Sequence, residues 1–136
     1  MLHLADNLIA KIAEDIHSGL SVFVHKQTHE LVSYAADSSY LEPDDEEYQE
    51  VQQNPNDYFQ IKGMTSDEAY FMRENFIETV ENKSLQDDLK ACLYGKKNKF
   101  ANFKHRVRNS EYEQKWFDFE AEAQNEYIRK QLEKFC

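Results

Sequence analysis

Residues that form tight turns and covalent cross-links are scarce in this chain, whose 136 residues include three glycines, two prolines and two cysteines. So few glycines and prolines indicate long regular elements with few tight turns. Cys92 and Cys136 lie far apart and predict no disulfide framework. In a reducing cytosol they are expected to be a small core side chain and a free thiol.

Long apolar segments are also absent, and the longest uninterrupted runs, residues 69–72 and 91–94, contain four residues each. A membrane span needs about 20 apolar residues and a signal-peptide core about 7–15, so we expect a cytoplasmic protein without a membrane partner. Hydrophobic residues make up 40% of the chain and aromatic residues 13%, enough for a packed core. The length fits a single domain, predicted to span residues 1–136.

Charge of one sign is missing from two long stretches. Between Lys26 and Lys62 the chain has nine acids and no Lys or Arg, whereas between Asp88 and Glu111 it has seven Lys and Arg and no acid. Residues 1–82 carry a balance of −13 and residues 83–136 a balance of +3, against −10 for the whole chain. Such segregation creates surface potentials that select partners, but it identifies no reaction.

The N-terminal part shows the periods of one helix and three strands. Apolar residues recur at helical spacing over residues 4–16, and Gly19 stands where a left-handed C-terminal cap belongs. Residues 20–25 alternate with the period of a strand, and residues 31–34 repeat that composition, which predicts a hairpin. Residues 58–61 are a third candidate strand.

The acidic stretch after the hairpin predicts a short helix. Pro43 suits the first helical position, and the acids of residues 44–47 would then lie in the first turn, at the positive end of the helix dipole. The turn residues 54–56 would end it. Residues 1–63 are therefore expected to contain a helix, a small antiparallel sheet of about three strands and this acidic segment.

The chain after residue 64 is predicted to be all helical. Three hydroxyl residues precede apolar-periodic runs and have an acid three positions later: Thr65 with Glu68, Ser84 with Asp87, and Ser110 with Glu113. With a short basic helix between them, they predict about four helices over residues 64–136. Trp116 is expected to be buried in the helix that Ser110 opens. With the small sheet of residues 1–63 and these helices, the predicted fold class is α+β.

One candidate surface is basic: Lys96, Lys97, Lys99, Lys104, Arg106 and Arg108. Beside Phe100 and Phe103 these side chains could hold a phosphate or a nucleic-acid strand. The alternative is that both phenylalanines, three residues apart on a helix, face the core while the cations are only solvated. We favour the alternative, because stacking rings must be exposed and this spacing predicts burial.

The other candidate surface is acidic: Glu42, Asp44, Asp45, Glu46 and Glu47. Oxygen ligands suit a divalent cation, but the spacing of a calcium loop is absent. A solvated helix face is the simpler interpretation. A third possibility is that the acidic segment docks on the basic one, within a chain or between two chains, which would orient a contact rather than hold the fold.

Catalytic and metal motifs are not evident. His25 and His29 flank the hairpin turn, but a metal would need a third ligand from elsewhere, and no Cys-x-x-Cys or His-Glu-x-x-His pattern accompanies them. Cys92 lies on the apolar side of a helix, where a thiol is usually inert. We therefore nominate no catalytic residue and expect neither a cofactor nor a metal.

The chain resembles an uncharacterised bacterial protein family of the UPF series, the 0158 type, over nearly its whole length. The resemblance is carried by these stretches: Leu89–Gly95, Phe100-x-x-Phe103-Lys104, Trp116-Phe117-x-Phe119, Gly19-x-x-Val22, Pro55-x-Asp57-Tyr58 and Phe76-Ile77. The family often has an arginine after the first phenylalanine, where this chain has Ala101. The resemblance implies a compact α+β domain in the bacterial cytoplasm, and it implies nothing about mechanism.

Three functions remain open. The first is a non-catalytic protein-interaction module that uses opposed acidic and basic surfaces. The second is a phosphate- or RNA-contacting protein acting through residues 96–108, which exposure of Phe100 and Phe103 would favour. The third is a small hydrolase with a site at the sheet–helix junction, which would need a pocket with convergent carboxylates or histidines.

Overall fold

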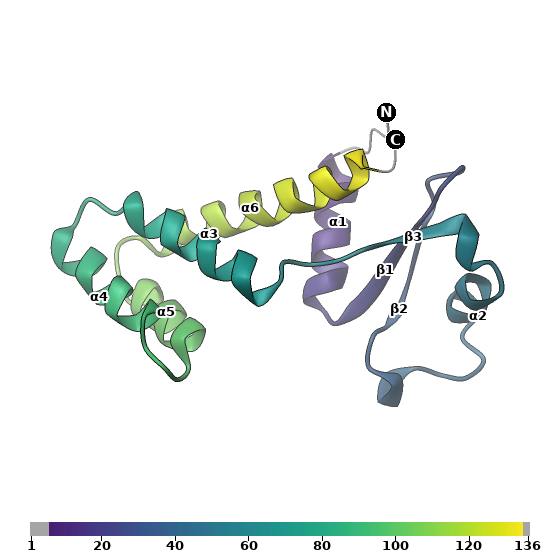
Figure 1. Cartoon of the computed structure of the whole chain (residues 1–136), viewed down its shortest axis with the longest axis horizontal. Coiled ribbons are helices and arrows are strands. Elements are labelled where there is room, and N and C mark those ends of the chain that lie inside the picture. The colour runs from purple at the N-terminus through teal and green to yellow at the C-terminus, as the bar shows by residue number, and fades with distance from the viewer. Residues whose placement is uncertain (1–5, 135–136) are drawn as a thin grey trace. The chain divides into compact units, whose positions relative to one another are not determined.

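The computed structural model describes residues 6–134 and confirms the α+β class (Figure 1). An N-terminal helix and a three-stranded antiparallel sheet precede the C-terminal helices. The elements are α1 (Asp6–His17), β1 (Leu20–His25), β2 (Leu31–Ala35), the 3-10 helix η1 (Ser38–Tyr40), α2 (Glu46–Gln53), the 3-10 helix η2 (Pro55–Asp57), β3 (Tyr58–Ile61), α3 (Ser66–Glu78), α4 (Lys83–Leu93), α5 (Lys99–Arg108) and α6 (Glu113–Glu133).

The chain divides into two compact units. Unit 1 contains the chain up to Gly63 and from Gln124 onward, and unit 2 contains Met64–Ala123. The long helix α6 supplies residues to both. The expectation that residues 1–136 form a single domain stays a prediction, and the two units are described separately below.

In unit 1, β1 is the central strand of the sheet, in the order β2-β1-β3. Val22 pairs with Ser33 of β2 and with Ile61 of β3, so the predicted hairpin and third strand are confirmed. The alternation along β1 buries one face of the sheet against α1 and the end of α6. The side chains of this core are Ile9, Ile12, Val22, Val24, Phe59, Ile61, Ile128 and Leu132.

The opposite face of the sheet contacts α2. The ring of Phe23 stacks on that of Tyr34 with centroids 5.3 Å apart, and Tyr34 meets Tyr48 of α2 edge-on at 5.2 Å. Gly19 has a φ of 91°, which an L side chain rarely adopts, and its N–H bonds the Ile16 carbonyl at 3.1 Å. It ends α1 as predicted.

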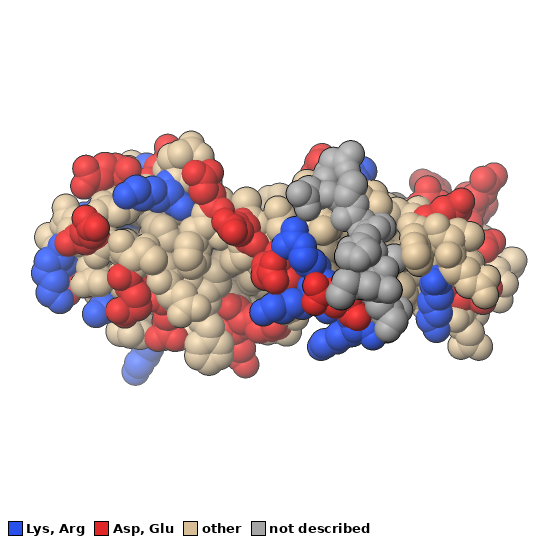
Figure 2. Space-filling view, turned by 90° about the horizontal axis from the view of Figure 1, so that it is seen from above, with Lys and Arg blue, Asp and Glu red and all other residues tan. Residues whose placement is uncertain are grey.

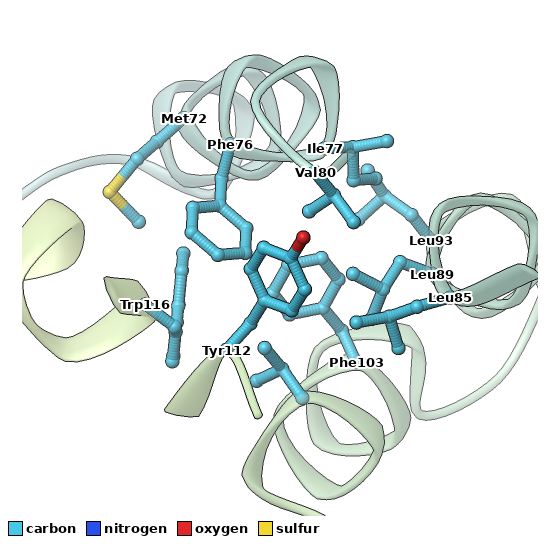
Figure 3. Packing of buried hydrophobic residues seen from close by; sticks show 11 residues of the cluster. Met72, Phe76, Ile77, Val80, Leu85, Leu89, Leu93, Phe103, Tyr112 and Trp116 are labelled. Atoms are coloured by element: carbon cyan, nitrogen blue, oxygen red, sulfur yellow. The ribbon is translucent and has the colours of Figure 1, made fainter. Parts of the chain in front are cut away.

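Unit 2 is built around an aromatic core (Figure 3). Phe76 of α3 contacts Trp116 of α6 at 5.1 Å between centroids, and Trp116 contacts Phe103 of α5 at 5.0 Å, both with steeply inclined rings. Trp116 is 1% exposed, which confirms its predicted burial. Leu85 and Leu89 of α4 close the cluster. Large aromatic side chains from α3, α5 and α6 thus meet at the centre of the cluster that holds these four helices together.

The starts of two helices can be compared with the sequence predictions: that of α3 is confirmed and that of α2 is corrected. The predicted Thr65 capping box is present, with the Thr65 hydroxyl and the Glu68 side chain each bonded to the other's backbone. Pro43 does not open α2: the helix begins at Glu46, and Asp45 caps it by accepting the Tyr48 N–H at 2.9 Å. Asp44 therefore precedes the helix, because the side chain of Asp45 supplies the acceptor that the first turn needs.

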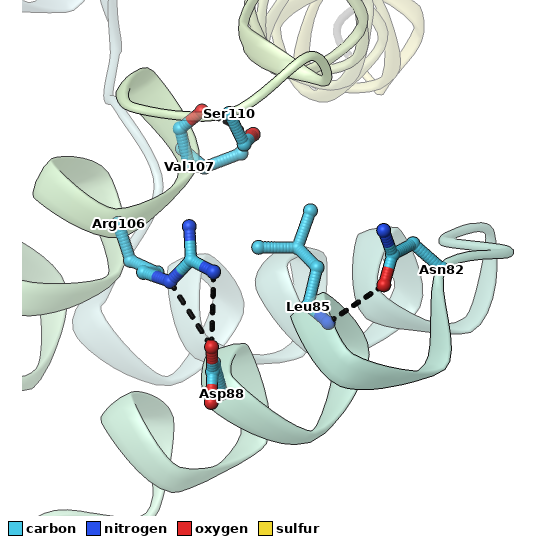
Figure 4. A network of polar contacts seen from close by, with 6 residues as sticks. All are labelled: Asn82, Leu85, Asp88, Arg106, Val107 and Ser110. Carbon is cyan, nitrogen blue, oxygen red and sulfur yellow. Dashed lines mark hydrogen bonds and ion pairs between the residues drawn. The ribbon is translucent and has the colours of Figure 1, made fainter.

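Two other predicted caps were wrong. The cap of α4 is Asn82, whose Oδ1 accepts the Leu85 N–H at 3.1 Å (Figure 4), so Ser84 lies inside the first turn. Ser110 does not open α6, which begins at Glu113. Its hydroxyl instead donates to the Val107 carbonyl at 2.6 Å and accepts the Tyr112 N–H at 3.1 Å, stabilising the turn that precedes the helix.

None of the helices in the described part of the chain is long and apolar enough to cross a membrane.

Candidate functional site

The basic segment separates into paired arginines and unpaired lysines. Arg106 donates from Nε and Nη2 to one oxygen of Asp88, at 3.2 and 2.9 Å, and so joins α5 to α4 (Figure 4). Arg108 lies 3.8 Å from Glu113, with its guanidinium carbon 5.7 Å from the centroid of the Phe117 ring. Both arginines are therefore engaged within unit 2.

The lysines remain available. Lys96 and Lys97 lie in the loop before α5, Lys99 begins that helix and Lys104 follows one turn later; all four are exposed. Across residues 6–134 none of the four has a carboxylate partner. Three of the four are within four residues of each other, so their charges add locally despite the net charge of −10.

The two phenylalanines of the basic segment have different environments. Phe103 is fully buried in the core of unit 2, whereas Phe100 is half-buried and packs against that core. Burial of Phe103 confirms the packing interpretation for that ring and removes it from any stacking on nucleotide bases. Phe100 keeps part of its surface accessible.

Beside Phe100 lies a pocket that sequence reasoning did not find. Its volume is about 360 Å³, and it lies between the first turns of α3 and α5. The lining residues are Ser66, Asp67, Tyr70, Asn98, Lys99, Phe100 and Ala101. The Lys99 Nζ lies 5.0 Å from the centroid of the Tyr70 ring and 5.9 Å from that of Phe100. The pocket thus combines aromatic walls, a cation at the rim and one carboxylate, Asp67.

The start of α5 adds positive potential to this pocket. Asn98 has a left-handed φ of 53° and makes no side-chain cap bond, so the first N–H groups of α5 keep no such acceptor. Partial burial, followed by the charges of Glu74 and Tyr94, raises the pKa of Tyr70 above its ordinary value. The Tyr70 hydroxyl therefore stays protonated at neutral pH and can donate a hydrogen bond.

Arg73 lies on the inner side of Phe100. Its guanidinium carbon is 4.2 Å from the centroid of the Phe100 ring, and burial lowers its pKa, an effect that Glu120 partly opposes. The sequence held a signal for this arrangement, because Arg73 is a lone charge on the apolar face formed by Ala69, Met72 and Phe76.

The acidic segment belongs to unit 1, and some of its carboxylates are engaged there. Asp45 caps α2, and a Glu47 oxygen accepts the backbone N–H of Ser33 on the edge strand β2 at 2.8 Å. Glu42, Asp44 and Glu46 are exposed and, within the described residues, have no side-chain partner. On the face that Figure 2 draws, carboxylates and cations are interspersed rather than gathered by sign.

His25 has a structural role in the hairpin turn. Its Nδ1 accepts the N–H groups of Gln27 and Thr28, both at 3.1 Å, and its ring meets Tyr58 edge-on. His29 has a φ of 64° in the same turn. Among residues 6–134 no three His, Cys, Asp or Glu side chains are grouped so that they could hold a metal ion.

Comparison with known proteins gives one match. The model of the Uncharacterised protein family (UPF0158) matches residues 3–135, almost the full chain. No curated protein matches, and no solved structure matches.

Proposed function

The chain belongs to the uncharacterised family UPF0158, and from its own surface we propose that it is a non-catalytic, cytoplasmic protein-interaction module. The observation that carries the proposal is the pocket of unit 2, where the exposed Lys99 lies beside the half-buried rings of Tyr70 and Phe100. Lys96 and Lys97 are exposed in the loop that precedes it. This pocket, with the basic loop that precedes α5, binds an acidic protein segment. The free thiol of Cys92 agrees with a reducing compartment.

An acidic segment with an aromatic side chain fits this pocket chemically. The ring would pack against Tyr70 and Phe100, which together with Lys99 offer an apolar and cationic wall. Carboxylates next to the ring would lie near the lysines of the preceding loop. Each exposed charge pair contributes at most about 1 kcal/mol, so the ring supplies affinity and the charges supply orientation and association rate.

The alternatives have less support. Binding to single-stranded RNA needs exposed rings for stacking, and Phe103 is buried in the core. A hydrolase needs convergent carboxylates or histidines in a pocket, whereas the lining of this one holds a single carboxylate, Asp67. The basic loop near an aromatic pocket is therefore better matched to a protein ligand.

The test uses two fluorescent probes of equal charge, a short peptide of glutamates around one central tyrosine and a single-stranded RNA. We expect the peptide to bind at physiological salt and the variant Lys96→Gln/Lys97→Gln/Lys99→Gln to bind it about tenfold more weakly, since three charge pairs are removed. Fluorescence anisotropy measures both. The RNA should not bind measurably.

The matched control changes three exposed lysines of unit 1, Lys26, Lys62 and Lys130, to Gln. This variant has the same net charge as the first, so a general electrostatic effect would weaken the peptide equally in both. Equal weakening would refute a specific site. Tight RNA binding that is lost only in the Lys96 variant would replace the proposal with an RNA-binding function.

A further inference from the structure

Tyr40 is the most exposed large hydrophobic side chain of the described residues, with 79% of its surface accessible. It ends the 3-10 helix η1, which is held by its own cap: Asp37 Oδ1 accepts the Ser39 N–H at 2.9 Å and the Ser39 hydroxyl at 2.7 Å. The cap fixes the backbone that carries the exposed ring, so the backbone need not be ordered on binding, which is a property of a binding anchor.

The residues after Tyr40 are acidic and unengaged. Glu42 and Asp44 follow at alternate positions around Pro43, and both are exposed without a side-chain partner in the part of the chain that the structure describes. The Tyr40–Asp44 segment therefore has the composition that the pocket of unit 2 selects: one aromatic ring followed by carboxylates.

We propose that the pocket between α3 and α5 receives the Tyr40–Asp44 segment of a second copy of this chain. The Tyr40 ring packs against Tyr70 and Phe100, and Glu42 and Asp44 lie near Lys96, Lys97 and Lys99. This inference rests on the proposed function, because it names the partner of the same site.

The carboxylate of the pocket, Asp67, favours a tyrosine ring as the occupant. Asp67 would repel an approaching acid, but it can accept a hydrogen bond from the tyrosine hydroxyl. A phenolic ring is thus a better occupant than a purely acidic side chain. The lysines remain free to contact the acids that follow the ring.

The association is expected to be weak. The segment is short, so the buried area falls at the low end of specific interfaces, and the net charge of −10 opposes self-association at long range. A dissociation constant of about 0.1–1 mM is consistent with such a contact.

The experiment uses two charge-reversed variants. The lysine-reversed variant carries Lys96→Glu, Lys97→Glu and Lys99→Glu, and the acid-reversed variant carries Glu42→Lys and Asp44→Lys. Each alone should sediment as a monomer at concentrations where the wild type associates. A mixture should associate again, because it pairs the unaltered pocket of the acid-reversed chain with the unaltered segment of the lysine-reversed chain.

Nuclear magnetic resonance locates the contact. In isotope-labelled acid-reversed protein, the amides of Tyr70 and Lys99 should shift saturably when unlabelled lysine-reversed protein is added. The shifts should disappear when the added chain also carries Tyr40→Ala. A control with Glu30→Lys and Asp57→Lys, two exposed acids elsewhere in unit 1, should associate with itself as the wild type does.

Absence of shifts in the mixture, or shifts that persist with Tyr40→Ala, would overturn the inference. The peptide assay separates this failure from failure of the proposed function. If the glutamate–tyrosine peptide binds through the lysines while the mixed variants stay monomeric, the site binds a different acidic protein. If neither binds, the pocket is not an interaction site.

Discussion

Arg73 and Phe100 form a stacked pair in unit 2, with the guanidinium carbon 4.2 Å from the ring centroid. The same guanidinium lies 5.3 Å from the centroid of Trp116, and its side chain is only 12% exposed. Nη1 donates to the Ala69 carbonyl at 3.0 Å, Glu120 is 3.9 Å away, and the buried Nε has no hydrogen-bond partner among the residues that the structure describes. Aromatic faces therefore contribute more to this cation than its carboxylate does.

This arrangement predicts how Arg73 substitutions rank. Arg73→Lys should lower the free energy of unfolding by about 1–2 kcal/mol, because a compact, strongly hydrated ammonium cannot stack on the ring. Arg73→Met should stay within about 1 kcal/mol of wild type, since it keeps apolar contact and removes a desolvated charge. Urea denaturation measures both.

Glu120→Gln is the control for the ion pair. At 3.9 Å, with the carboxylate about a third exposed, its loss should cost less than about 1 kcal/mol. A larger loss for Arg73→Met than for Arg73→Lys would mean that charge, and not ring contact, holds the residue.

Trp116 should be the most sensitive position of unit 2. It is 1% exposed and contacts both Phe76 and Phe103, so Trp116→Ala should cost about 3–5 kcal/mol by leaving a cavity. Phe117→Ala, at a neighbouring ring that is 36% exposed, should cost far less. Red-shifted and easily quenched tryptophan emission from the native protein would contradict the burial of Trp116.

The two candidate caps of α4 can be separated by mutation. Asn82→Ala should cost about 0.5–2 kcal/mol because it removes the acceptor of the Leu85 N–H. Ser84→Ala should be near neutral, since Ser84 lies exposed in the first turn. Thr65→Ala should resemble the first variant and Ser38→Ala the second. Equal denaturation midpoints for Asn82→Ala and Ser84→Ala would contradict the assignment of Asn82 as the cap.

Local signals explain which parts of the fold the sequence predicted. The alternation of Val22 and Val24 and the reciprocal Thr65–Glu68 box depend on residues close in the chain, and the structure has both. The cap of α4 was misassigned because Asn82 and Ser84 are both strong capping residues two positions apart. Propensity alone cannot choose between them, and helix packing decides which turn begins first.

The candidate site depended on contacts that no local pattern contains. The pocket joins the first turn of α3 to that of α5, about thirty residues away, and Arg106 meets Asp88 across two helices. The charge count alone groups Arg106 with Lys96, although Arg106 is paired with Asp88 and Lys96 has no carboxylate partner within residues 6–134. Periodicity did predict that Phe103 would be buried, and a buried ring cannot stack on nucleotide bases.

Asp37 should titrate below the ordinary aspartate pKa of 3.8, because the Ser39 hydroxyl and then the Ser39 N–H bond its carboxylate. A lowered pKa means that the carboxylate stabilises η1 above the ordinary value, and that this contribution is lost as the pH falls through the lowered value. Ser39→Ala should raise the pKa of Asp37 by removing the larger cause. Carboxyl NMR titration measures the shift, and identical midpoints in the two proteins would show that the hydroxyl bond is absent.

Glu47 should protect one amide of the sheet edge. The Ser33 N–H points away from β1 and is accepted by a Glu47 oxygen at 2.8 Å, so a side chain occupies a position where another strand could pair. An exposed bond of this kind contributes about 0.5–1 kcal/mol, and Glu47→Ala should therefore speed hydrogen exchange at Ser33 by roughly two- to fivefold. Glu47→Gln should have a smaller effect, because its amide oxygen still accepts the bond. Glu46→Ala, at the exposed neighbouring position, should leave Ser33 unchanged; if it speeds exchange equally, the protection comes from the charge of the segment and not from the bond to Glu47.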